Sequence, residues 1–249
     1  MTDGGGLSAL VGAGAVVLGP EEPGPIRHPT WDHLRITRGV GVGIEAGRIA
    51  LVAPDADVRA WYAERQGHRG TEARGHSELI ECGGRLLTAG LVDPHTHALF
   101  GAPRLDDHAR RARGDDYKSI AAAGGGILQS MRDFRSRGED ELVALGRSRL
   151  RWVAALGTTT VEIKSGYGLE SDAEFRALRA IRRLAAEGPL HVVATFLGAH
   201  EIPPEYRPRR EAWVRLLIDE LSPRVGRERL AEFCDVFCEP GVFSLEESE

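Results

Sequence analysis

The chain has 249 residues, of which 42% are hydrophobic and 28% charged, and its formal net charge is −5. This composition is ordinary for a globular protein, and the interspersed basic residues do not predict the clustered basic face of a nucleic-acid-binding protein. No apolar run approaches the roughly 20 residues that span a membrane, and three cysteines are too few for a disulfide framework. We therefore expect a cytoplasmic protein that has neither a nucleic-acid nor a membrane partner.

Short strands joined by turns are predicted in the first third of the chain. Residues 7–18 are apolar and favour a strand, and residues 41–44 and 48–52 are β-prone runs on either side of the turn Glu45-Ala46-Gly47. Residues 55–66 have a helical composition, so we expect one helix among these strands.

A second β-hairpin is predicted around Gly83-Gly84. The β-prone residues 79–82 and 85–87 flank this dipeptide, which is typical of two-residue hairpin turns. We therefore expect the two flanking segments to pair with each other.

From Leu91 onward, strand-like runs alternate with helical ones, which is the pattern of a parallel βα architecture. The clearest unit runs from the β-branched residues 159–163, through a loop at residues 164–168, to a strand at residues 190–197. Between that loop and the second strand, apolar residues recur at helical spacing: Phe175, Leu178, Ile181 and Leu184. The spacing predicts a helix that buries this face.

Two pairs of residues have the spacing of a capping box, in which a serine and a glutamate satisfy free amides at the start of a helix. Ser171 and Glu174 form the first pair, and Ser244 and Glu247 form the second. We expect a helix to begin at each pair. Two further helices are predicted at residues 139–156 and 211–221, and a further strand at residues 233–238.

If this alternation belongs to a (β/α)8 barrel, the chain holds only the first part of that barrel. Such a barrel has about 250 residues and rarely fewer than about 200. Residues 87–249 are fewer than that, and the sequence stops within the first turn of the helix predicted at Ser244. We therefore expect the barrel to be truncated on its C-terminal side.

In a βα barrel, the loops that follow the strands build the active site. His95 and His97 follow the first predicted strand, and residues at i and i+2 of an extended segment point to the same side. Two imidazoles on one side can hold a borderline metal such as zinc. The pattern favours metal ligation over a hydrogen-bonded structural pair.

Other side chains occupy corresponding positions after the later strands. Lys164 and Tyr167 lie in a glycine-flanked loop, His200 follows Gly198-Ala199, and Glu239 follows the last predicted strand. From the residues alone, a functional role and a packing role both stay open for Lys164, Tyr167 and His200.

These motifs resemble those of the metal-dependent amidohydrolase superfamily. Residues 87–97, Leu-Thr-Ala-Gly-Leu-Val-Asp-Pro-His-Thr-His, are similar to the opening of its barrel, and Gly47-Arg48-Ile49 is similar to a turn of its small β-sandwich domain. Residues 161–169 and 196–200 resemble the imidazolonepropionase family more specifically. The resemblance covers roughly residues 35–249.

The resemblance implies an α/β fold. Residues 1–86 would belong to the small β-sandwich domain, and residues 87–249 would form the first part of an amidohydrolase-type (β/α)8 TIM barrel. It also implies hydrolysis of 4-imidazolone-5-propanoate to N-formimidoyl-L-glutamate in histidine degradation, by water that one zinc or iron ion activates. It is compatible with a homodimer of the intact protein.

The resemblance also implies roles for single residues, with His95 and His97 as metal ligands. Four further residues match positions that contact the small-molecule substrate: Arg104, Tyr117, Tyr167 and His200. The planar guanidinium of Arg104 suits a propanoate carboxylate. The remaining ligands, a histidine and an aspartate, and the water-activating glutamate are expected beyond Glu249, so no catalytic residue is assigned within this chain.

Two other interpretations stay open. In a cyclic amidohydrolase with a two-metal site, a carboxylated Lys164 would bridge the two ions, and metal stoichiometry distinguishes that enzyme from a mononuclear one. In the second interpretation, the chain is an inactive fragment that lacks the remaining ligands. An assay of imidazolone hydrolysis with metal supplied tests that interpretation.

Overall fold

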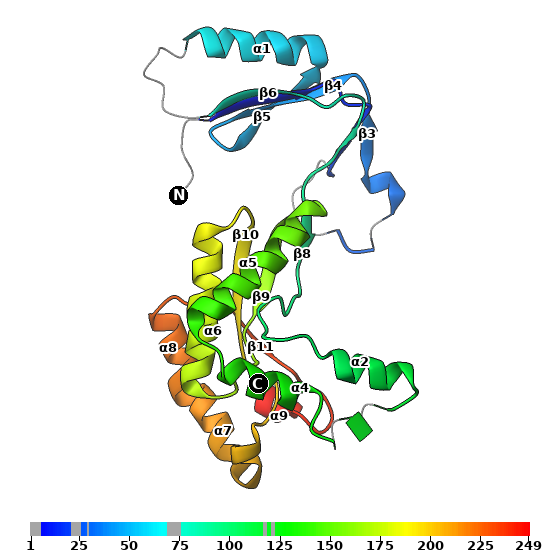
Figure 1. Ribbon diagram of the computed structural model, residues 1–249. Coiled ribbons are helices and arrows are strands. Elements are labelled where there is room, and N and C mark those ends of the chain that lie inside the picture. Colours follow the sequence, from blue (N-terminus) through cyan, green and yellow to red (C-terminus); the bar gives the residue numbers. More distant parts are fainter. Residues whose placement is uncertain (1–5, 21–25, 29, 69–75, 117–118, 121–122) are drawn as a thin grey trace. The chain divides into compact units, whose positions relative to one another are not determined.

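The computed structural model describes residues 6–20, 26–28, 30–68, 76–116, 119–120 and 123–249 (Figure 1). Its contacts divide the chain into two compact units, Met1–Ala89 and Gly90–Glu249. Among the described residues, no helix combines the length and the apolarity needed to cross a membrane.

A four-stranded sheet covered by one helix lies in the first unit. Its strand order is β5 (Arg48–Pro54), β4 (Val40–Glu45), β1 (Leu7–Val11) and β6 (Ser77–Glu81). β4 and β5 form an antiparallel hairpin, which confirms the predicted turn between them. The predicted helix is confirmed as α1 (Asp55–His68), whose Val58 and Tyr62 pack against apolar residues of β1.

The prediction of a hairpin at Gly83-Gly84 is wrong. β6 pairs in parallel with β1, whereas β7 (Leu86–Leu87) lies in a second sheet of strand order β3 (Arg35–Thr37), β2 (Ala15–Leu18) and β7. The amide of Gly84 donates to the carbonyl of Gly12, so the β6–β7 connection runs beside the β1–β2 connection. Pairing with distant strands therefore overrides the local turn signal. For the same reason, residues 7–18 form two strands rather than one.

The second unit contains a parallel sheet whose strand order follows the chain. Its strands are β8 (Leu91–Asp93), β9 (Thr158–Lys164), β10 (His191–Ala199) and β11 (Phe233–Val236). Every neighbouring pair is parallel, so the carboxyl ends of all four strands meet at one edge. The predicted α/β alternation is confirmed.

Helices connect these strands and follow the last of them (Figure 1). Between β8 and β9 lie α2 (Leu105–Ala112), α4 (Ile127–Arg135) and α5 (Glu139–Ala155), and between β9 and β10 lies α6 (Ser171–Glu187). The helix predicted at residues 211–221 is longer, because η2 (Pro204–Arg209), α7 (Arg210–Leu216), the π-helical η3 (Leu217–Leu221) and α8 (Ser222–Arg227) follow one another. α9 (Leu245–Ser248) begins at the predicted capping box, which is confirmed.

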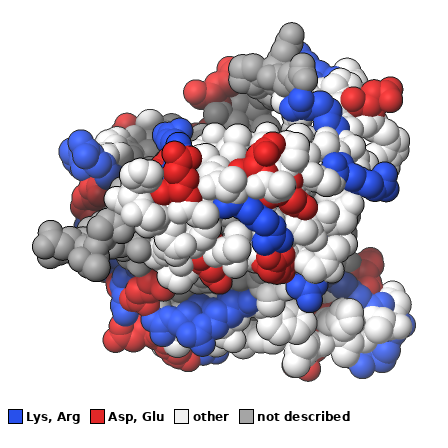
Figure 2. Space-filling model, turned by 90° about the horizontal axis from the view of Figure 1, so that it is seen from above, with Lys and Arg blue, Asp and Glu red and all other residues white. Residues whose placement is uncertain are grey.

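Acidic and basic side chains lie interspersed on the surface, as Figure 2 shows for one face. Helices α5 and α6 are joined by ion pairs that include Arg179–Glu139 at 2.9 Å and Arg183–Asp140 at 2.7 Å. Exposed pairs of this kind contribute at most about 1 kcal/mol each. Burial of the apolar residues beneath them is therefore the larger contribution to holding these helices in place.

The apolar face predicted for α6 is buried. Its four residues, Phe175, Leu178, Ile181 and Leu184, are each at most 2% exposed. They belong to the same hydrophobic cluster as Val161 and Ile163 of β9. Helix α6 is therefore fixed against the sheet, and it fixes in turn the loop that joins it to β9.

Replacing Ile181 with alanine is expected to lower the free energy of unfolding by about 2–5 kcal/mol, because a fully buried side chain is removed and a cavity remains. Ile218 provides a matched control, since it is 59% exposed in a neighbouring helical segment. Its replacement by alanine is expected to change the same quantity by no more than about 0.5 kcal/mol. Urea denaturation of the two variants measures both, and equal losses would contradict the burial of α6.

The capping box predicted for Ser171 and Glu174 is wrong. Ser171 is the first helical residue of α6, and the side chain of the preceding Glu170 makes no capping hydrogen bond. The carboxylate of Glu174 instead accepts hydrogen bonds from backbone amides of the loop before the helix. A long side chain in the first turn can reach either its own helix end or a loop folded over it, and sequence spacing does not distinguish the two.

Candidate active site

The site residues expected in the second unit lie beyond the carboxyl ends of its parallel strands. His95 and His97 follow β8, Tyr167 follows β9, and His200 follows β10. This is the edge of a parallel α/β sheet at which ligands bind. Tyr117 falls outside the residues that the structure describes.

Three aromatic rings from three loops are in contact at this edge. The rings of His97 and His200 stack with their centroids 4.9 Å apart and their planes inclined by 17°. The Tyr167 ring lies 5.5 Å from each of them, and the His95 ring lies 5.8 Å from that of His97. The structure therefore brings together four of the residues singled out from the sequence.

The imidazole of His97 is neutral, and one of its ring nitrogens lacks a hydrogen-bond partner among the described residues. Burial, together with the nearby His200 and His95, lowers the pKa of His97 to about 4, so the ring is uncharged near neutral pH. Its Nδ1 is buried and has no hydrogen-bond partner among the residues that the structure describes. A buried polar atom without a partner is costly, and a neutral imidazole nitrogen is the form that coordinates a metal.

His95 and His97 fit the chemistry of a metal site as two of its ligands. Protein zinc sites use three or four ligands of this kind. Within the part of the chain that the structure describes, no three histidine, cysteine, aspartate or glutamate side chains are arranged to hold an ion. The Nδ1 of His97, which has no hydrogen-bond partner among the described residues, supports a role of this side chain as one metal ligand.

His200 is held by the loop that carries Tyr167. Its Nδ1 lies 2.8 Å from the carbonyl oxygen of Gly166. Since a carbonyl only accepts, Nδ1 carries the proton and Nε2 is left as an acceptor in the neutral ring. Burial lowers the pKa of His200, although the hydrogen bond to Gly166 opposes this effect, so the neutral form is favoured.

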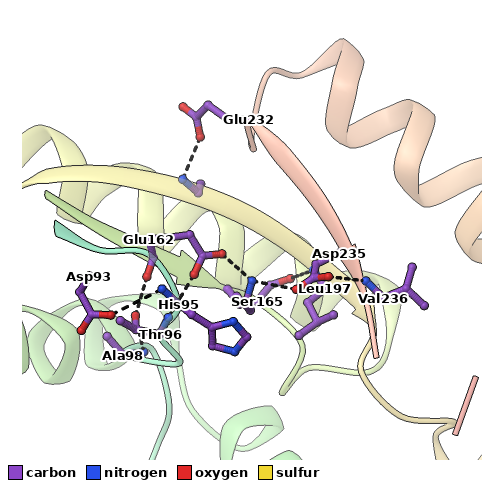
Figure 3. A network of polar contacts seen from close by, with 12 residues as sticks. Asp93, His95, Thr96, Ala98, Glu162, Ser165, Leu197, Glu232, Asp235 and Val236 are labelled. Atoms are coloured by element: carbon purple, nitrogen blue, oxygen red, sulfur yellow. Dashed lines mark hydrogen bonds and ion pairs between the residues drawn. The ribbon is translucent and has the colours of Figure 1, made fainter. Parts of the chain in front are cut away.

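A buried lysine, Lys164, joins two carboxylates across the strand ends, and Figure 3 shows these carboxylates, Glu162 and Asp235. The Nζ of Lys164 lies 2.8 Å from Glu162 Oε1 and 2.8 Å from Asp235 Oδ2. The other oxygen of Glu162 accepts the amide of Thr96, and the Thr96 hydroxyl donates to the Glu162 carbonyl. These contacts tie the segment between His95 and His97 to β9. A pocket of about 320 Å³ adjoins the cluster.

Lys164 is a charged ammonium in this arrangement. Burial alone would lower its pKa, but hydrogen bonds to Asp235 and Glu162 raise the pKa above its ordinary value. A carboxylated lysine forms from the neutral amine, which these two carboxylates disfavour. The contacts therefore favour the mononuclear interpretation over the two-metal one.

Arg149 of α5 organises the loop that follows His97. Its guanidinium donates to the carbonyl oxygens of Ala98 at 3.2 Å, Gly101 at 2.6 Å and Phe100, and it lies 3.5 Å from the centre of the Phe100 ring. Five donors in a fixed plane allow one arginine to hold several carbonyls at once. The backbone that leads from His97 toward α2 is therefore held from the helix side.

Arg104 stands at the start of α2, directly before its first helical residue. Its Nε lies 3.9 Å from Asp107, and its side chain is 33% exposed. Burial raises the pKa of Tyr167 while the charge of Arg104 opposes that rise, and the same charge contributes to the lowered pKa of His200. Arg104 is therefore within electrostatic reach of both rings.

Two groups of site residues were not identified from the sequence. Glu162 and Asp235 were missed, although a carboxylate two positions before Lys164 in a β-branched strand is a signal that charges face one side. Arg149 was missed because its partners are backbone carbonyls of a distant loop, and Glu174, predicted only as a capping residue, instead holds amides of the loop just before its helix. Sequence spacing carries no signal for such contacts.

No family model matches the chain. The chain is 45% identical over 240 residues to the imidazolonepropionase of Symbiobacterium thermophilum, and 44% identical over 239 residues to that of Solibacter usitatus. Each alignment covers 96% of this chain and 54% of the relative. The imidazolonepropionase of Desulfotalea psychrophila is 48% identical over 178 residues, which are 71% of this chain and 43% of that protein.

Among solved structures, E. coli guanine deaminase aligns with 89% of this chain and 42% of its own, at 12% identity and a TM-score of 0.49, a similarity too low to support an argument. The sequence matches are far stronger. The chain spans about half the length of the curated relatives it matches. Over that shared length, its sequence is similar to those of the imidazolonepropionases.

Proposed function

We propose that this chain supplies the metal- and substrate-binding loops of a hydrolase that converts 4-imidazolone-5-propanoate to N-formimidoyl-L-glutamate in histidine degradation. The observation that carries the proposal is the 45% identity to an imidazolonepropionase over 96% of the chain. The contact of His97, Tyr167 and His200 at the carboxyl ends of parallel strands supports it. The reaction adds one water molecule across a ring C–N bond.

His95 and His97 would hold one divalent ion, zinc or iron. Such an ion, when bound, makes a water molecule acidic enough to attack as hydroxide near neutral pH. The contribution of His97 is a neutral, buried nitrogen that needs no deprotonation at this pH. The contribution of Glu162 is to hold the intervening Thr96 backbone through its amide.

The substrate would be held by side chains around the same edge. Arg104 would bind the propanoate carboxylate through two parallel hydrogen bonds. Tyr167, whose pKa burial raises, would remain a protonated phenol and donate to the substrate. His200 would accept at Nε2, since Gly166 fixes its proton on Nδ1. Tyr117 is proposed as a further substrate contact on the resemblance alone.

The architecture belongs to the same proposal. Residues 87–249 would form the first part of an amidohydrolase-type (β/α)8 barrel, because four parallel strands in chain order alternate with helices as such a barrel requires. Residues 1–86 would belong to the small β-sandwich domain. We further propose that the intact protein works in the cytoplasm as a homodimer.

Product analysis tests the reaction. In the experiments below, the term family-length protein means a protein that contains this chain and has the full length of its curated relatives. When loaded with zinc or iron and incubated with 4-imidazolone-5-propanoate, it is expected to yield N-formimidoyl-L-glutamate, which mass spectrometry identifies. Removal of the ion by a chelator is expected to stop product formation. Unchanged substrate after incubation with the loaded protein would contradict the proposed function.

A further inference from the structure

A fully buried carboxylate holds the loop that carries Tyr167. Glu174, in the first turn of α6, has no exposed surface. Its carboxylate accepts the amides of Gly166 at 3.0 Å, Gly168 at 2.8 Å and Leu169 at 2.9 Å. One side chain therefore satisfies three amides of the loop at residues 165–170, one on each side of Tyr167 and one beyond.

The loop needs such an anchor because of its backbone conformation. Gly166 has a φ of +101° and Leu169 a φ of +50°, both in the left-handed region. A non-glycine residue there is strained and persists only where its surroundings fix it. A Cβ on Gly166 would lie 2.7 Å from the carbonyl oxygen of Leu197, so the loop also approaches β10 closely. The Glu174 carboxylate offsets this strain with three hydrogen bonds.

The same loop connects Glu174 to both rings. Tyr167 lies between Gly166 and Gly168, and the amides of these two glycines donate hydrogen bonds to the Glu174 carboxylate. The carbonyl of Gly166 in turn accepts the Nδ1 proton of His200. A shift of this loop would therefore move the Tyr167 side chain and remove the contact that fixes the His200 ring.

We propose that Glu174 is a positioning residue, which sets the places of Tyr167 and His200 without touching the substrate. The proposal rests on the proposed function, in which those two side chains contact the substrate. A glutamate used only to start the helix would have no such effect. The alternative role is general stability of α6, and the test separates the two.

The informative variant is Glu174→Gln in the family-length protein. Glutamine keeps the volume and one acceptor oxygen, but its NH2 group would face the amide of Gly166. Since misplacement of binding groups by about 1 Å can cost about a hundredfold, we expect kcat/KM to fall by about 10- to 100-fold. Metal content is expected to stay at the wild-type level, because His95 and His97 lie on another loop.

Ile181→Ala provides the matched control. Ile181 is fully buried on the same helix and belongs to the core rather than to the loop contacts. This variant is expected to be less stable but, at a temperature where it is folded, to keep kcat/KM within about twofold of the wild type. A loss of kcat/KM in Ile181→Ala as large as that in Glu174→Gln would overturn the proposal.

Two further measurements keep the test decisive. Glu174→Asp retains the charge but withdraws the oxygens, and it replaces Glu174→Gln if the latter does not fold. Either variant, when folded and metal-loaded with wild-type kcat/KM, overturns the proposal, and so does the failure of both to fold, since Glu174 would then act in folding. Nitrogen-15 NMR of His200 reports whether its Nδ1 proton is still held. If the wild-type family-length protein turns over no substrate, the proposed function fails. The role of Glu174 is then decided by NMR alone: loss of the held Nδ1 proton in the Glu174 variants supports the positioning role, and its retention overturns it.

Discussion

Replacing His97 with alanine in the family-length protein is expected to abolish metal binding and hydrolysis together. Within the described part of the chain, its buried Nδ1 has no hydrogen-bond partner, and a pKa of about 4 keeps the ring neutral and able to coordinate a metal. Loss of one imidazole leaves too few donors to hold the ion against water. Because a catalytic metal supplies several kcal/mol of transition-state stabilisation, turnover should fall by at least about a thousandfold.

Elemental analysis of the purified variant measures the bound metal directly. His191→Ala is the matched control, because His191 is an exposed histidine at the start of β10, at the opposite end of the strand from His200. This control is expected to keep its metal and its activity. A full complement of metal in His97→Ala would show that His97 packs against His200 without coordinating.

Arg104→Lys is expected to reduce kcat/KM by roughly 10- to 150-fold. Lysine keeps the charge but lacks the planar pair of donors that matches a carboxylate. One charge-assisted hydrogen bond is worth about 1.5–3 kcal/mol, and about 1.4 kcal/mol corresponds to a tenfold change in rate. The electrostatics support this role, since the charge of Arg104 influences the pKa of both Tyr167 and His200.

A ring analogue without the carboxylate separates recognition from loop structure. The defect of Arg104→Lys should be much smaller toward this analogue, because no partner is then left unpaired. Arg113→Lys makes the same change at an exposed position directly after α2 and should leave both rates unchanged. Equal losses of Arg104→Lys toward both compounds would mean that Arg104 shapes the loop and does not bind the propanoate.

The sequence predicted those parts of the fold that depend on local pattern. The helical spacing of Phe175, Leu178, Ile181 and Leu184 predicted α6 because burial of one face imposes that period. The strands that β6 and β7 pair with were not predicted, because those partners, β1 and β2, lie far away in the sequence. Local signals can announce a turn, but they do not say which strands the chain joins after it.

The candidate site divides in the same way. His95, His97 and His200 were singled out because they follow predicted strands. In the structure, the rings of His95 and His200 both lie next to the ring of His97. The contacts that hold these rings come from Glu174, Arg149 and Glu162, and they could not be predicted. They depend on strand register and on loops folded over helix ends, which a single sequence does not specify.

The most direct test of the account relates catalytic rate to bound metal in one titration. The metal-free family-length protein is supplied with increasing zinc or iron, and the disappearance of imidazolone absorbance is followed at each step. The rate is expected to rise in proportion to bound metal and to saturate at one ion per chain, since Lys164 is engaged as a charged ammonium by Glu162 and Asp235. Saturation at two ions per chain, or a rate independent of bound metal, would contradict the account.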